Sequence, residues 1–108
     1  MGLDMFLYAD KNGSEEEVGY WRKHPNLHGF IVNNFAGGVD ECQRIDLSLD
    51  DMTDIVEAVK NDDLPTTTGF FFGYSDPDRD IETLEIFRKA IELANKNPDY
   101  KFYYQASW

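Results

Sequence analysis

Both ends of this chain alternate in polarity with the two-residue period of a β-strand. Successive side chains of a strand point to opposite faces of a sheet, so each end predicts a strand with two different faces. In residues 3–9, one face carries Leu3, Met5 and Leu7 and the other carries Asp4, Phe6 and Tyr8. In residues 101–107, one face carries Phe102, Tyr104 and Ala106 and the other carries Tyr103 and Gln105. We expect the two terminal strands to share one sheet.

Four helices are predicted between these strands, over residues 14–23, 25–35, 48–60 and 80–95. The first has a cap at Ser14 and a capping-box glutamate at Glu17. The second starts at Pro25, and Gly37 and Gly38 end it. The third opens at Ser48 or Asp50, and its buried stripe is Leu49, Met52, Ile55, Val56 and Val59. The fourth is expected to bury Ile81, Leu84, Phe87, Ile91 and Ala94.

Two further segments are apolar but short. Residues 42–47 predict a strand, and Phe70, Phe71 and Phe72 form either a strand or a packed loop. With 108 residues, of which 42% are hydrophobic, the chain suits one globular domain over residues 1–108. The predicted fold class is α+β, a small antiparallel or mixed sheet that includes both terminal strands and packs against about four helices.

The net charge limits the partners of such a domain. The 21 acidic and 10 basic residues give a formal charge of −11 at pH 7. Unspecific attraction to nucleic acids or anionic membranes needs a positive surface, so we expect neither as a direct partner. Cys42 is the single cysteine, which excludes an intrachain disulfide and favours a reducing cytoplasmic location. The sequence has no apolar stretch of membrane-spanning length and no signal-peptide pattern at its start.

Several short blocks resemble a known group of proteins. These blocks are Met1-Gly2-Leu3-Asp4-Met5, Gly19-Tyr20-Trp21-Arg22-Lys23 followed by His28-Gly29, Gly69-Phe70-Phe71-Phe72-Gly73, and Tyr103-Tyr104-Gln105-Ala106-Ser107-Trp108. In their order and spacing they are similar to small uncharacterised proteins of bacteriophage and prophage genomes. The resemblance implies a phage setting, with the cytoplasm of the host cell as the location, and no activity that transfers to named residues.

One basic, aromatic cluster stands out in this acidic chain. Trp21, Arg22 and Lys23, with His28 nearby, predict a pocket for a nucleotide or a small phosphorylated ligand, in which arginine donates to the anion and tryptophan stacks. The alternative is that Trp21 belongs to the core and the cations neutralise the glutamates at 15–17. His24 and His28 are four residues apart, but Pro25 separates them, so no metal site or other cofactor is expected.

Nothing in the sequence assembles a catalytic centre. The carboxylates at 76–80 alternate as in a calcium-binding loop, but Ile81 and Phe87 occupy the positions that need glycine and glutamate. Cys42 follows two acidic residues, which oppose thiolate formation, and a nucleophilic role needs His28 brought to it by the fold.

The leading hypothesis is therefore a non-enzymatic binding protein that engages and modulates or inhibits a host protein with a basic surface. Carboxylates on a rigid helix can imitate the regular negative charge of a nucleic-acid backbone. The expected host protein is therefore a nucleic-acid-binding protein or a defence factor. The predicted partner-binding residues are Asp50, Asp51, Asp54, Glu57, Asp62 and Asp63. The other interpretation of this charge is a solvated surface that keeps the protein in solution. The oligomeric state is open.

Overall fold

The computed structural model describes residues 2–67 and 78–108 of the chain. The elements in these residues are β1 (Asp4–Lys11), β2 (Ser14–Arg22), α1 (Pro25–Phe35), β3 (Ile45–Leu47), α2 (Leu49–Lys60), α3 (Asp78–Lys96) and β4 (Tyr100–Ser107). The predicted segment at Phe70, Phe71 and Phe72 lies outside the described residues.

The four strands form one antiparallel sheet in the order β2-β1-β4-β3. The two terminal strands are neighbours, and Leu7 lies opposite Tyr104. The α+β class and the pairing of the terminal strands are thus confirmed, and the sheet is antiparallel rather than mixed. The described residues contain three helices, where the sequence predicted about four.

The predicted helix at residues 14–23 is wrong, because this segment is strand β2. Asn12 and Gly13 have φ angles of 54° and 86°, the left-handed conformation at both positions of a two-residue hairpin turn. The Gly13 amide donates to the Asp10 carboxylate at 2.9 Å and holds the turn. Gly19 also needs a position without a side chain, since a Cβ there would lie 2.5 Å from the Ile86 side chain. Pairing with β1 outweighs the capping pattern at Ser14.

The helix predicted from Pro25 is confirmed as α1. Its last turn closes on the Val32 carbonyl, which accepts from the Ala36 and Gly38 amides. Gly37 and Gly38 have φ angles of 63° and 81°, the conformation that glycine adopts without strain.

The strand predicted at residues 42–47 is shorter than expected. Pairing with β4 covers only Ile45–Leu47. Cys42 has a φ of 58°, which is incompatible with an extended strand, and its carbonyl accepts from the Gln105 amide at 3.0 Å. The start of α2 is as predicted: Ser48 and Asp51 form a capping box, each side chain accepting from the other residue's backbone amide.

The last helix, α3, buries the predicted stripe except at its first turn. Phe87 is fully buried, Leu84, Ile91 and Ala94 are partly buried against the core, and Thr83 and Ala90 are buried as well. Ile81 is 65% exposed instead of facing inward. The indole of Trp21 contacts the buried side of α3. Its Nε1 donates to the Thr83 hydroxyl at 2.8 Å, and its ring stacks on Phe87 with 5.5 Å between the centroids.

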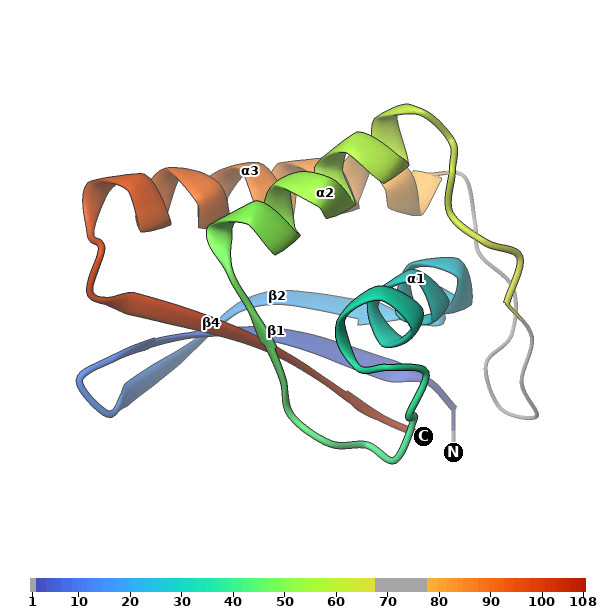
Figure 1. The fold of residues 1–108 in the computed structure, drawn as a ribbon, viewed down its shortest axis with the longest axis horizontal. Coiled ribbons are helices and arrows are strands. Elements are labelled where there is room, and N and C mark those ends of the chain that lie inside the picture. The colour runs from blue at the N-terminus through green and yellow to red at the C-terminus, as the bar shows by residue number, and fades with distance from the viewer. Residues whose placement is uncertain (1, 68–77) are drawn as a thin grey trace.

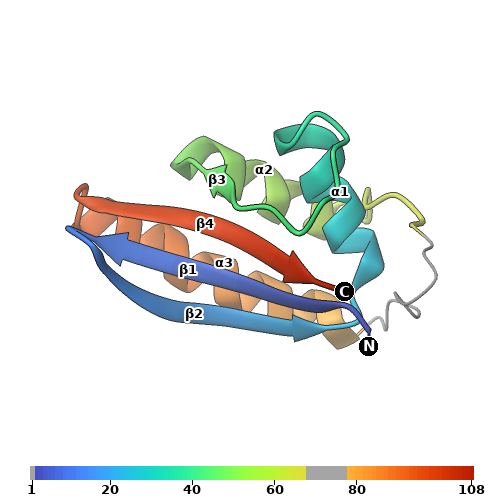
Figure 2. The same ribbon diagram turned by 90° about the horizontal axis from the view of Figure 1, so that it is seen from below.

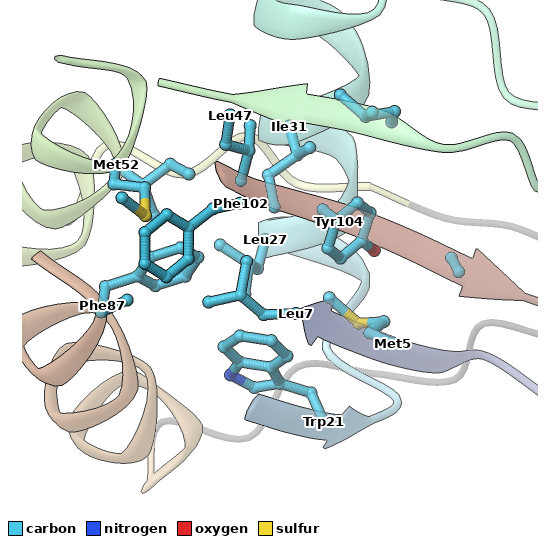
Figure 3. Close-up of a cluster of buried hydrophobic side chains, with 14 of the residues drawn as sticks. Met5, Leu7, Trp21, Leu27, Ile31, Leu47, Met52, Phe87, Phe102 and Tyr104 are labelled. Atoms are coloured by element: carbon cyan, nitrogen blue, oxygen red, sulfur yellow. The ribbon is translucent and has the colours of Figure 1, made fainter. Parts of the chain in front are cut away.

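All three helices lie on one face of the sheet. Helices α2 and α3 pack side by side above it, and α1 adds Leu27 and Ile31 to the same core (Figure 1). The core contains Met5 and Leu7 of β1, with side chains from every helix around them (Figure 3). Seen from below, β1, β2 and β4 lie in front of α3, and no helix in the described residues covers this side (Figure 2). The sheet therefore has a helix-covered face and an open face.

Candidate functional site

The predicted ligand cluster is spread over several places in the fold. Trp21 is fully buried on the helix-covered face, whereas Arg22 is exposed on the open face. Lys23 is exposed in the turn before α1, and His28 is buried inside α1. Within the part of the chain that the structure describes, these four side chains share no cavity. Binding of a phosphorylated ligand there stays a prediction that this geometry does not favour.

The two histidines lie in separate environments. His24 Nε2 lies 3.2 Å from the Asp80 carboxylate at the start of α3. Burial lowers the pKa of His24, and the Asp80 carboxylate opposes this shift without cancelling it. His28 instead contacts Tyr104 of β4. In residues 2–67 and 78–108, no three histidine, cysteine or acidic side chains are grouped to hold a metal ion.

His28 belongs to a buried polar network that the sequence analysis missed. Its Nδ1 lies 2.6 Å from the Tyr104 hydroxyl, and its Nε2 lies 3.0 Å from the Asp40 carboxylate. Asp40 also accepts from the Trp108 indole at 3.1 Å. The contacting pair His28 and Tyr104 is 76 positions apart in the sequence, so no local motif marks the network.

This network joins α1 to β4 and to the segment between α1 and β3. Burial raises the pKa of Tyr104 well above its usual value, and Asp40 and Cys42 add to the shift. The phenol therefore keeps its proton, and its oxygen lies within hydrogen-bond distance of Nδ1 of His28. Nε2 of the same ring faces the Asp40 carboxylate, so the imidazole links α1 to β4 and to the segment before β3.

The predicted acidic residues lie on and just after α2. Asp50, Asp54 and Glu57 are exposed and spaced i, i+4, i+7, which places them on one stripe of the helix; we call them the acidic ridge. Asp51 is half-buried and serves the capping box. Asp62 and Asp63 are exposed beyond the end of the helix. The side-chain ion pairs recorded in the described residues do not involve the ridge.

The open face of the sheet carries a second feature, which the strand alternation predicts only in part. Four aromatic rings from three neighbouring strands lie in one continuous row, Tyr20, Phe6, Tyr8 and Tyr103. The centroid separations along the row are 5.2, 6.0 and 4.9 Å. We call this row the aromatic row. Tyr20 entered the sequence analysis as a helix residue, so its place beside Phe6 was not foreseen.

Two hollows flank these surfaces. A hollow of about 220 Å³ lies beside Phe6 and Tyr8 on the open face, and Cys42 and Gln105 form its other side. A larger groove of about 660 Å³ runs between the start of α2 and β4. Four polar side chains that line the larger groove are paired with one another, Ser48 with Asp51 and Arg44 with Asp46. Lys101 also lines it.

None of the described helices is both long enough and apolar enough to cross a bilayer. No protein-family model, curated protein or solved structure matches this chain.

Proposed function

We propose that this chain is a non-enzymatic acidic binding protein of bacteriophage type, which engages a basic surface of a host protein and modulates or inhibits it. The observation that carries the proposal is the acidic ridge, Asp50, Asp54 and Glu57, together with a chain charge of −11. A nucleic-acid-binding protein or a defence factor has the positive groove that such a ridge fits.

The ridge is supported on a rigid element. Met52, Ile55 and Val59 are buried beneath it, and the Ser48 capping box fixes the first turn of α2. A rise of about 1.5 Å per residue separates Asp50 from Glu57 by about 10 Å along the helix. The carboxylates are therefore held in a fixed array. Long-range attraction by such an array raises the rate of association with a basic partner.

Partner capture tests the proposal. The protein is immobilised, a host lysate is passed over it, and the retained proteins are eluted with a salt gradient. We expect a basic protein to be retained and to elute at moderate salt, because screening weakens contacts between exposed charges. A retained partner that is acidic, or whose binding does not respond to salt, contradicts the proposal.

A pair of triple variants locates the surface. D50N/D54N/E57Q removes three charges from the ridge and leaves Asp51 in its capping box. E82Q/E85Q/E92Q removes three exposed charges from α3 and is the matched control. We expect the ridge variant to lose at least about tenfold in affinity, in the range of several weak charge contacts. The control should lose much less, and equal losses would mean that only net charge matters.

A further inference from the structure

The aromatic row on the open face is held in place by carboxylates. The Tyr20 hydroxyl donates to Asp4 at 2.7 Å, and the Tyr103 hydroxyl donates to Glu15 at 3.0 Å. Asp4 belongs to β1 and Glu15 to β2, and both side chains lie on the open face. The rings therefore have fixed positions, with an anion at each end of the row.

The chain itself places a guanidinium on this surface. The Arg44 guanidinium carbon lies 4.0 Å from the centroid of the Tyr103 ring, and its Nε donates to Asp46 at 2.9 Å. Arginine is thus held by a ring face and a carboxylate together, the combination that favours it over lysine. The other end of the row has the same two groups, since Tyr20 is 41% exposed and its hydroxyl contacts the Asp4 carboxylate. Phe6 and Tyr8, between the two ends, are partly exposed.

The charge of the open face selects the occupant. Strand alternation places more acidic than basic side chains there, Asp4, Asp10, Glu15, Glu17 and Asp46 against Arg22, Arg44 and Lys101. Nucleic acid bases also stack on aromatic rings, but their phosphates would meet this negative surface. A second copy would bring another charge of −11. A basic protein segment is the occupant that both the rings and the carboxylates attract.

We infer that the open face is a docking surface for an arginine-bearing segment of a protein partner, with guanidinium groups packed against the accessible parts of the Phe6, Tyr8 and Tyr20 rings. The hollow beside Phe6 and Tyr8 gives one arginine side chain room to enter. The inference rests on the proposed function, which supplies the class of partner, a basic protein. It adds a second surface, which prefers arginine over other positively charged side chains.

Two short peptides test this surface, one alternating arginine with serine and one alternating lysine with serine. Their affinities for the full chain are measured by calorimetry, and the contacts are mapped by NMR. We expect the arginine peptide to bind at least about fivefold more tightly, the scale of one or two stacked guanidinium groups. Its largest shifts should fall on the ring signals of Phe6, Tyr8 and Tyr20.

Variants then assign the preference to the rings. Y8T/Y20T should bring the two peptides to nearly equal affinity. Y100T, on the helix-covered face of β4, is the matched control and should keep the arginine preference. Circular dichroism checks that each variant is folded. If a variant does not fold, the NMR map of the peptide contacts on the unaltered chain decides whether the rings bind the arginine peptide.

The outcomes separate this inference from the proposed function. Equal affinities, or shifts confined to residues 50–57, overturn the aromatic docking surface while leaving the acidic ridge as a binding site. A dimer seen by sedimentation that dissociates in Y8T/Y20T also overturns it, because the rings would then be covered by a second copy. An arginine preference that persists when D50N/D54N/E57Q has lost the captured partner supports two separate surfaces.

Discussion

The two faces of the sheet use the same residue types in different ways. Neighbours in the sequence fall on opposite sides: Trp21 and Tyr104 are fully buried under the helices, whereas Tyr20 and Tyr103 lie on the open face. Under the helices, the aromatic polar atoms pair with the Thr83 hydroxyl and the His28 imidazole. On the open face the phenols pair with carboxylates that remain near water. Aromatic residues therefore build the core on one side of the sheet, and on the other side they form a polar surface on which Tyr20 is exposed and Tyr103 is covered.

The largest expected difference between the faces is in the loss of stability when one aromatic side chain is removed, compared at Trp21 and Tyr20. Trp21→Ala should lower the free energy of unfolding by about 3–5 kcal/mol, because it empties a closely packed site between β2 and α3. Tyr20→Ala should cost far less, since that ring is 41% exposed. Urea unfolding of both variants measures the difference. Similar losses would mean that the open face is covered in solution.

The next largest difference is in the pair Tyr104 and Tyr103, where removal of one hydroxyl is compared on the two faces. Tyr104→Phe should cost about 1–3 kcal/mol, because Nδ1 of His28 would lose its buried hydrogen-bond partner. Tyr103→Phe should cost less, since water replaces its hydroxyl as the donor to Glu15. Thermal unfolding of the two variants checks the order, and a larger loss for Tyr103→Phe would contradict the assigned roles.

The smallest expected effect is on the pH dependence of stability, through His24 on the helix-covered side. Burial lowers the folded-state pKa of His24, so the unfolded chain takes up a proton more readily than the folded chain. Stability should therefore fall as the pH drops through about 6.5, the value for an unfolded histidine, and level off below the folded pKa. Urea midpoints between about pH 7.5 and 5.5 should decline in the natural chain and decline less in His24→Gln. An equal decline in His24→Gln would assign the proton uptake to another group.

Much of the fold could be predicted from local patterns. The terminal strands, α1 and the capped start of α2 follow from alternation, from Pro25 with the glycines that end α1, and from Ser48. The one wrong element arose where two local signals compete. Ser14 and Glu17 are typical of a helix start, whereas Asn12-Gly13 is typical of a hairpin, and the hairpin gains a full row of hydrogen bonds with β1.

The candidate surfaces also differ in how far local patterns predict them. The acidic ridge was foreseen, because its three carboxylates lie within two turns of one helix and helical spacing is enough to align them. The ligand cluster at Trp21, Arg22, Lys23 and His28 was not brought together. Once residues 14–22 form a strand, neighbours such as Trp21 and Arg22 point to opposite faces.

The sequence alone determined the period of the terminal strands and of the three helices, the excess of negative charge and the side chains on each face of the terminal strands. Only the tertiary structure decided that residues 14–22 form a strand, which strand face the helices cover and which distant groups meet, as in the pairing of His28 with Tyr104. The physical reason is that periodicity arises from backbone geometry within a few residues. The choice of partner depends on packing among groups far apart in the sequence, such as Glu15 and Tyr103 at 88 positions, which no local pattern encodes.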